Sequence, residues 1–334
     1  MSETQEVKPN FLKSIRIENF RGIKSLDING FKHLNVFVGR PNVCKTAVLE
    51  SMALYLGAPN TLLDAIGYRG LDKNHILNSL FYDYDTKQTI KICSGEDTLE
   101  VRKEGEVLYD GDGRPSQTTK LILSYVDKGG TPHRGVFIEH RGDGFSINNS
   151  TMRHPIQFRF MHSTGAAHSL ATDLIEITTY KEKRERLQKA CKDFSPSISN
   201  IKFGHNNMIM VEKEGLGRDL EIGAMGSGFK RYISLQAAII NGAKFVLVDE
   251  LENGLHFELI REVISVMLKE KEVQFFITTH SKEFMKYLCC ELEDCEEDSL
   301  ALFRLYERGG MIRAGAYSQE GAISNIELSN EVRI

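Results

Sequence analysis

The sequence predicts an α/β fold: a mostly parallel core sheet flanked by helices, with an antiparallel β-rich lobe and a helical insertion. Two runs, KFVLVDE at 244–250 and VQFFITTH at 273–280, are apolar and rich in β-branched and aromatic residues, which is typical of buried parallel strands. The segment between them, HFELIREVISVMLKEK, has the apolar spacing of a helix. Between about residues 87 and 161, short β-type runs alternate with turn clusters such as DGDGRP and DKGGTP, which predicts the antiparallel lobe.

The remaining elements follow from local patterns. SIRIENF (14–20) and LNVFVG (34–39) are short β-type runs. The segment AVLESMALYLG (47–57) contains helix-forming residues and ends in glycine, a common helix stop. A further helical region is predicted from about 169 to 194, after the β-rich part of the chain.

The composition is that of an ordinary globular protein: 334 residues, 41% hydrophobic and 26% charged, with a net charge of −4. The polar start MSETQEVKPN is not a secretory signal, and no apolar run approaches the roughly 18 residues that a membrane helix needs. The six cysteines form no regular framework. These observations predict a cytoplasmic protein with reduced thiols and no membrane partner.

The mild acidity argues against a dedicated nucleic-acid binder, which normally carries a basic surface. One stretch, Tyr180 to Lys192, is locally basic, and its apolar members Tyr180, Leu187 and Cys191 fall with Phe194 on one helical face. A solvated face of an amphipathic helix is the favoured interpretation. Direct DNA contact remains an alternative.

The stretch VFVGRPNVCKT (36–46) resembles the phosphate-binding pattern G-x-x-x-x-G-K-[ST] with one departure. Gly39, Lys45 and Thr46 occupy their expected places, whereas Cys44 replaces the second glycine. A predicted strand precedes the loop and a predicted helix follows it, which is the context that this motif requires.

Acidic and histidine residues follow two of the predicted core strands. Asp249 and Glu250 come directly after one strand, and His280 ends the next. Asp249 could hold the water shell of Mg²⁺ opposite Thr46, and Glu250 could polarise an attacking water. His280 could reach the γ-phosphate if the two strands are neighbours.

A small-residue turn opens the apolar helix in AMGSGFKRYISLQAAI (224–239). Gly226, Ser227 and Gly228 would expose backbone N–H groups and the positive end of the helix dipole to an anion. The turn lies 20 to 25 residues before the acidic strand end.

In this order, the phosphate loop, the small-residue turn, the acidic strand end and the strand-end histidine resemble the ABC-type ATPases. The fragments IRIENFRGIKSL, MGSGFKR, VDELENGLH and TTHSKEF are most similar to the RecF/SMC-like branch and the OLD-family ATPases, AAA-family ATP-binding proteins. The resemblance extends from about Phe11 to the last residue. It implies a P-loop NTPase of ABC type that binds ATP and Mg²⁺.

The resemblance also implies roles for individual residues. Glu250 would be the catalytic carboxylate and His280 the γ-phosphate sensor, while Thr46 and Asp249 would bind the metal. Asn19, Phe20 and Arg21 resemble a segment that lies near the nucleotide. The residues implied to bind the nucleotide are Gly39, Asn42, Cys44, Lys45, Thr46, Asp249, Gly226, Ser227, Gly228 and Arg21. In this class the small-residue signature turn completes the site of the opposite subunit, so the active unit would be a head-to-tail homodimer.

Four departures from the family pattern bear on the site. Whether Gly226 or Ser227 takes the place of the signature serine is open. The aspartate of many relatives is replaced by His256, although OLD-type sequences often have ENGLH there. A residue that enters the first helical turn does not need a positive φ, so we expect the small side chain of Cys44 to be tolerated. No glutamine of the Q-loop can be assigned; Gln88 and Gln117 are the candidates.

We expect a single ATPase head over residues 1–334. Within it, 1–86 would carry the phosphate loop, 87–200 the β-rich and helical insertion, and 201–334 the signature, acidic and histidine elements. Only 54 residues follow His280, so a TOPRIM nuclease domain, which OLD-type nucleases carry, is not expected.

Three functions are compatible with this pattern. The first is an ATP-driven dimerising switch, with slow hydrolysis, for a separately encoded nuclease or toxin-like effector, as in bacterial anti-phage defence. The second is a RecF-like DNA-repair or DNA-maintenance ATPase that binds DNA directly. The third is a non-enzymatic ATP-binding scaffold.

Overall fold

The computed structural model describes the part of the chain that contains the predicted core and site. The described residues are 11–57, 77–109, 115–126, 132–141, 144–149, 157–163, 167–205, 208–293 and 299–327.

A six-stranded core sheet has the order β16-β15-β3-β14-β13-β9. The strands from β15 to β9 are parallel, and β16 pairs antiparallel with β15 at the edge. The bounds are β3 Leu34–Val38, β9 Phe158–Met161, β13 Phe245–Val248, β14 Gln274–Thr278, β15 Leu300–Arg308 and β16 Met311–Tyr317. This confirms the predicted mostly parallel core.

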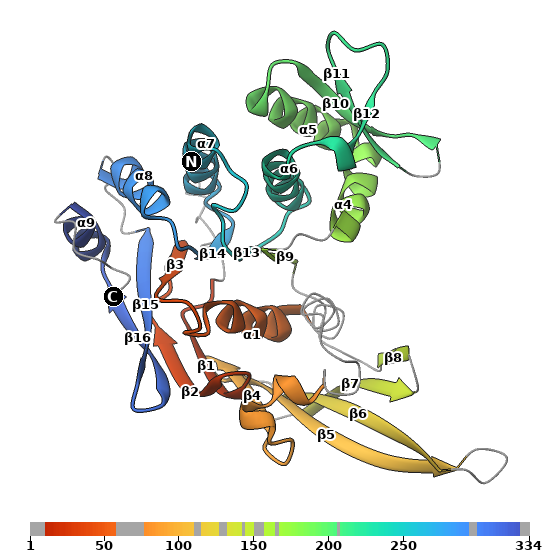
Figure 1. Ribbon diagram of the computed structural model, residues 1–334, viewed down its shortest axis with the longest axis vertical. Coiled ribbons are helices and arrows are strands. Elements are labelled where there is room, and N and C mark those ends of the chain that lie inside the picture. Colours follow the sequence, from red (N-terminus) through yellow and green to blue (C-terminus); the bar gives the residue numbers. More distant parts are fainter. Residues whose placement is uncertain are drawn as a thin grey trace, which may run out of the picture.

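Helices cover both faces of this sheet. Figure 1 shows α6, α7 and α8 on one face and α1 on the other. The bounds are α1 Lys45–Gly57, α6 Ser227–Ile240, α7 Phe257–Lys269, α8 Lys282–Glu293 and α9 Gln319–Glu327. Because both faces are covered, strand residues are buried on alternate sides: Val246 and Val248 of β13 pack into one core cluster and Leu247 into the other.

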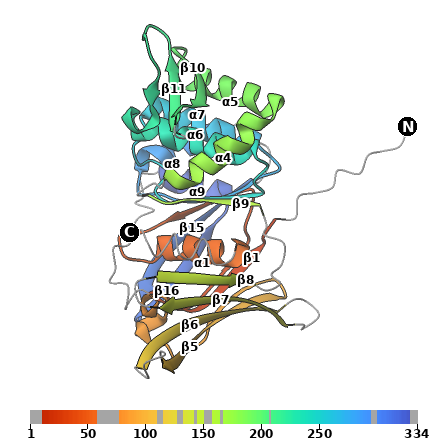
Figure 2. The same cartoon turned by 90° about the vertical axis from the view of Figure 1, so that its right-hand side faces the viewer.

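An antiparallel sheet of seven strands, ordered β2-β1-β4-β5-β6-β7-β8, packs on the far side of α1. Figure 2 shows the resulting layers, with α1 between the core sheet and this second sheet. The bounds are β1 Ser14–Phe20, β2 Ile23–Asn29, β4 Ile90–Ser94, β5 Asp97–Tyr109, β6 Pro115–Val126, β7 Pro132–Arg141 and β8 Gly144–Asn149. The predicted antiparallel lobe is therefore present.

A third region contains α4 Ala167–Thr179, α5 Lys181–Phe194 and a small sheet of β10 Ile198–Phe203, β11 Ile209–Lys213 and β12 Leu220–Glu221. Short 3₁₀ helices occur at Asn78–Leu80, Tyr82–Tyr84 and Ile222–Ala224. Both α4 and α5 pack against α6. This region therefore buries the apolar face of the helix that begins at Ser227.

Two boundaries differ from the sequence-based expectation. Strand β9 was expected in the antiparallel lobe, but it pairs parallel with β13 and belongs to the core sheet. Residues 1–86 were expected to form one part with the phosphate loop, but β1 and β2, of which only β1 was expected as a strand, form one edge of the antiparallel sheet, where β1 pairs with β4. A short apolar run does not reveal which partner strand will accept its backbone hydrogen bonds, so both errors have the same origin.

The basic helix α5 is amphipathic. Leu187, Ala190 and Cys191 are buried, and burial raises the pKa of the Cys191 thiol to about 12. Tyr180, expected on the same face, is 57% exposed. On the outer side the ion pairs are Lys181–Glu185, Lys183–Glu176, Lys189–Asp193 and Arg186–Glu270. Much of the positive charge is thus offset, which supports the interpretation as a solvated helix face.

Among the helices in the described ranges, none has the length and apolar character needed to cross a bilayer.

Candidate functional site

The phosphate loop runs from the end of β3 to the start of α1. Gly39 has φ +147°, and a Cβ placed there would lie 2.3 Å from the backbone oxygen of Leu305. Glycine is therefore required by both conformation and space. Asn42, in the middle of the loop, has φ +65°, a conformation that asparagine tolerates better than most residues.

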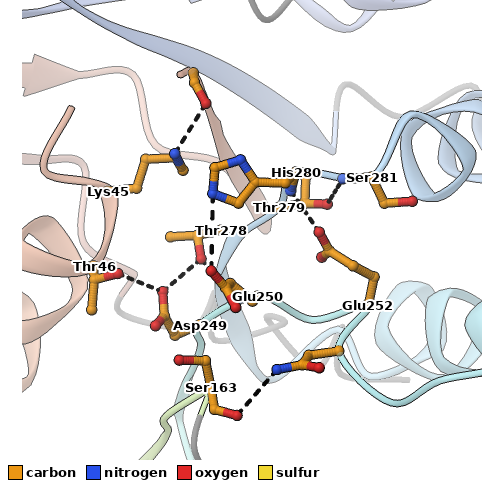
Figure 3. A network of polar contacts seen from close by, with 12 residues as sticks. Lys45, Thr46, Ser163, Asp249, Glu250, Glu252, Thr278, Thr279, His280 and Ser281 are labelled. Carbon is orange, nitrogen blue, oxygen red and sulfur yellow. Dashed lines mark hydrogen bonds and ion pairs between the residues drawn. The ribbon is translucent and has the colours of Figure 1, made fainter. Parts of the chain in front are cut away.

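Two side chains at the start of α1 point into this region. The buried Lys45 donates from Nζ to the backbone oxygens of Gly39 and Arg40, at 3.0 and 2.9 Å. Its ammonium group is thus held inside the loop. The hydroxyl of Thr46 donates to Oδ1 of Asp249 at 3.0 Å (Figure 3).

The acidic strand end lies next to the histidine strand end, the condition on which the role of His280 depended. Strands β13 and β14 are adjacent and parallel, and β14 pairs in turn with β3. The hydroxyl of Thr278, the last residue of β14, donates to Oδ1 of Asp249 at 2.8 Å (Figure 3). Three consecutive strands of the sheet therefore deliver the loop, Asp249 and His280 to one edge, the carboxyl ends of the strands.

The oxygen atoms of Thr46 and Asp249 suit Mg²⁺. This ion takes hard oxygen ligands and is usually held by one or two protein side chains together with water and phosphate oxygens. A hydroxyl and a buried carboxylate oxygen 3.0 Å apart provide such a pair. The residues present therefore fit a magnesium nucleotide.

Glu250 and His280 face each other at the edge of this group. Nε2 of His280 lies 3.9 Å from Oε1 of Glu250, a separation that is an ion pair only when the imidazole is protonated (Figure 3). Both side chains are partly exposed, at 41% for Glu250 and 34% for His280, so water can reach them. Glu250 has φ +49°, a left-handed conformation that non-glycine residues rarely adopt outside functional sites.

The loop after β13 adds residues that the sequence analysis did not identify. Oε1 of Glu252 accepts a hydrogen bond of 2.6 Å from the backbone N–H of His280 (Figure 3). Arg231, on α6, donates from Nη2 to the backbone oxygen of Asp249. Their only signal in the sequence is weak: they stand within the fragments VDELENGLH and MGSGFKR.

The signature turn lies at the start of α6. Gly226 is the N-cap and Ser227 the first helical residue, and both are exposed. Buried Gly228 approaches Gly254 so closely that a Cβ on either would clash, at 2.5 Å from the Gly254 oxygen or at 2.3 Å from Ser227 Oγ. The turn thus packs against the loop after β13, while α6 and the phosphate-loop helix α1 cover opposite faces of the core sheet (Figure 1). His256, two residues after Gly254, is the N-cap of α7 and is exposed.

The contacts of Arg21 differ from the predicted nucleotide contact. Its Nε donates to Oε2 of Glu50 on α1 at 2.9 Å, and both side chains are buried. Nη1 donates to Ser79 Oγ at 3.2 Å. The observed contact of Arg21 therefore anchors helix α1 to the turn after β1. The neighbouring Asn19 donates to the oxygen of Thr89, and Phe20 is buried in the core.

Gln88, one candidate for the Q-loop glutamine, does not join the group. Gln88 donates to Asp85 in the turn before β4, in the antiparallel lobe. Gln117 lies on β6, and its side chain is outside the described residues.

The expectation about the conformation of Cys44 was wrong. Cys44 has φ +64°, so the residue before α1 does adopt the left-handed conformation that glycine supplies without strain. A Cβ added at Gly22 would lie 2.7 Å from Cys44 Sγ, which shows that the thiol packs against the turn after β1. Cysteine at 44 is accommodated because residue 22 has no side chain.

We expect Cys44→Gly to keep the ATPase activity or raise it, and to leave the melting temperature unchanged or higher, because it relieves about 1–2 kcal/mol of left-handed strain. Gly22→Ala should lower the melting temperature in the wild-type background through a clash with the thiol. In the Cys44→Gly background the same change should cost much less. A double-mutant cycle by thermal unfolding measures this coupling. Equal losses in both backgrounds would mean that the two residues do not compete for space.

Comparison with known proteins agrees with this geometry. The family described as "AAA domain, putative AbiEii toxin, Type IV TA system" matches residues 96–286, more than half of the chain. The chain belongs to this family. It is an ATP-binding protein of the ABC and AAA P-loop ATPase type.

One protein similar to this chain is the "ATP/GTP phosphatase" of Helicobacter pylori (strain ATCC 700392 / 26695). It is 25% identical over 325 residues, which cover 83% of this chain and 87% of the relative. Family and relative together support nucleoside triphosphate hydrolysis in general.

Solved structures share the fold. An SmcHead bound to the C-winged helix domain of ScpA is 15% identical, covers 93% of this chain and 99% of its own, and has a TM-score of 0.53. An Smc head domain with an extended coiled coil, bound to the C-terminal domain of ScpA derived from Pyrococcus furiosus, is 13% identical, covers 96% and 100%, and has a TM-score of 0.51. The predicted ABC-type fold is confirmed.

Proposed function

We propose that this protein is an Mg²⁺-dependent ATPase that dimerises head-to-tail around ATP and acts as a switch for a separate effector. The observation that carries the proposal is the meeting of Lys45, Thr46, Asp249, Glu250 and His280 at one edge of the core sheet. An exposed helix N-terminus at Ser227 supplies a second anion-binding feature, on a helix that covers the face of the core sheet opposite to the phosphate-loop helix α1 (Figure 1).

The residues of one chain bind and orient the nucleotide. The ammonium group of Lys45 exchanges its loop carbonyl partners for phosphate oxygens, which offer full negative charge. The backbone N–H groups of the loop from Gly39 to Thr46, to which Pro41 contributes none, hold the phosphates together with the dipole of α1. Thr46 and Asp249 would hold Mg²⁺, which would neutralise phosphate charge.

The strand-end residues perform the chemistry. Glu250, reachable by water, polarises the attacking water as a general base. His280 lies beside it and would contact the γ-phosphate oxygens of a bound nucleotide. Glu252 fixes the backbone of His280 at the required position, so the loop after β13 ties the sensor to the base.

The second half of each site comes from the partner copy. Gly226 and Ser227 are exposed and present the first N–H groups of α6, which have no intrahelical partner. A γ-phosphate bound by one chain would accept hydrogen bonds from these N–H groups of the other chain. Two copies related by a two-fold axis would then enclose two nucleotides.

The output passes to another protein in this proposal. The family description, with its putative toxin and type IV toxin–antitoxin system, supports a role in bacterial defence. The resemblance of ENGLH to OLD-type sequences points the same way. A nuclease or toxin-like gene beside this one would favour the defence role over direct DNA maintenance.

The proposal is tested by light scattering of the wild-type protein with and without Mg²⁺-ATP. We expect a gain in mass to that of a dimer with ATP, and none with Ser227→Arg, whose bulky side chain would block the partner's phosphates. Ser227→Arg should still bind ATP. An unchanged mass in the presence of saturating ATP contradicts the proposed dimer, and strongly salt-dependent binding to DNA would favour the RecF-like alternative.

A further inference from the structure

The backbone of Glu250 is held in an unfavourable conformation. A non-glycine residue at φ +49° persists only where the surrounding structure fixes it. The peptide group between Asp249 and Glu250 is fixed from both ends. Its N–H donates to Oγ1 of Thr278 at 2.8 Å, and its oxygen accepts a hydrogen bond from Nη2 of Arg231.

These two contacts come from different parts of the fold. Thr278 ends β14, in the core sheet beside β13. Arg231 lies on α6, the helix that starts at the signature turn. Rotation of this peptide would change φ of Glu250 and so redirect its carboxylate. Arg231 is therefore the contact by which the signature helix reaches the proposed base.

The surroundings of Arg231 suit a positioning role. Burial lowers the pKa of its guanidinium, and the negative charges of Asp249, Glu252 and Glu250 oppose that change. Its Nε and Oε2 of Glu252 are buried, and within the described part of the chain neither has a hydrogen-bond partner. Arginine is thus kept charged among three carboxylates while donating to a backbone oxygen.

We propose that Arg231 is a positioning residue for the ATPase reaction: it holds the Asp249 carbonyl and thereby directs the carboxylate of Glu250 toward the attacking water. The inference rests on the proposed catalytic role of Glu250. Arg231 stands one helical turn after Ser227, so both lie on one side of α6. The turn that would meet the partner's nucleotide and the residue that aims the chain's own base thus belong to one rigid element.

Steady-state kinetics of Arg231→Met and Arg231→Lys test this inference. In Arg231→Met we expect kcat to fall about 10- to 100-fold, the size of effect that a small misplacement of a reacting group produces. The KM for ATP should stay within about 3-fold, because Lys45 and Thr46 are untouched. Arg231→Lys should recover part of the loss, since an ammonium can donate to one carbonyl but lacks the planar fork.

The matched control is Arg261→Met. Arg261 lies on α7, is 58% exposed and pairs with Glu291 at the surface, so its loss should leave kcat unchanged. Circular dichroism and the melting temperature monitor the fold of each variant. If Arg231→Met is unfolded, Arg231→Lys carries the test, because it retains the buried charge and should still turn over more slowly than wild type.

The decisive measurement repeats both substitutions in a Glu250→Gln background. If Arg231 acts through Glu250, it should then change the single-turnover rate by less than about 2-fold, as for residues that act as a unit. Additive losses, a raised KM with unchanged kcat, or wild-type kinetics of Arg231→Met would each overturn the inference. A wild-type rate in Glu250→Gln alone would instead refute the proposed function, so the two failures are distinguishable.

Discussion

Glu250→Gln is expected to bind Mg²⁺-ATP as the wild type does and to hydrolyse it about 10²–10⁴-fold more slowly, the range for loss of a general base. Glutamine keeps the volume and hydrogen-bonding reach of Glu250 but carries no negative charge to polarise water. Lys45, Thr46 and Asp249 retain their contacts, so nucleotide binding should be unaffected. Phosphate release under single-turnover conditions measures the rate, and calorimetry measures the affinity.

The same variant should accumulate as a dimer in Mg²⁺-ATP, because the uncleaved γ-phosphate would hold the Lys45 side of one copy to the Ser227 turn of the other. Light scattering would show a gain in mass that persists longer than in the wild type, and adding Ser227→Arg should abolish it. Glu272→Gln is a matched control, since Glu272 is an exposed carboxylate paired with Lys244. Slow hydrolysis without a change in mass would disprove the shared site while keeping the catalytic assignment.

Lys45→Ala should abolish Mg²⁺-ATP binding. The substitution removes the ammonium group that α1 places inside the loop, against the backbone oxygens of Gly39 and Arg40. This ammonium group is the proposed partner of the β- and γ-phosphates. Titration by calorimetry or by fluorescence of a labelled nucleotide is the measurement. Lys24→Ala, which alters an exposed lysine on β2, should bind normally. Wild-type affinity in Lys45→Ala would show that the phosphates bind elsewhere.

Much of this site was predictable from the sequence because strand ends carry it. The apolar, β-branched composition of the runs that form β13 and β14 is typical of buried parallel strands. Parallel strands that are neighbours, as these two are, have their carboxyl ends at the same edge of the sheet. Asp249 and His280 could therefore be placed near Thr46 without knowledge of any side-chain contact. The end of α1 at Gly57 and the start of α6 at Ser227 followed from local glycine and small-residue signals.

The rest depends on contacts that no local pattern encodes. Arg231 and Asp249 are 18 residues apart, and Glu252 and the N–H of His280 are 28 apart, so their pairing is decided only when α6 and the two strands pack together. The positive φ of Cys44 likewise depends on the space left by Gly22 in a distant turn. Sequence patterns report burial and periodicity, but not which polar groups burial will bring together.

The shared site is tested most directly by mixing two inactive variants. Every Lys45→Ala chain lacks a working phosphate loop and every Ser227→Arg chain lacks a working signature turn, so neither variant can complete a site by itself. A mixed dimer places both defects in one site and leaves the other intact. The mixture should therefore hydrolyse ATP although neither variant does so alone, and each mixed dimer should reach up to about half the rate of a wild-type dimer, since one of its two sites works. A mixture that stays as inactive as its components would contradict the head-to-tail dimer.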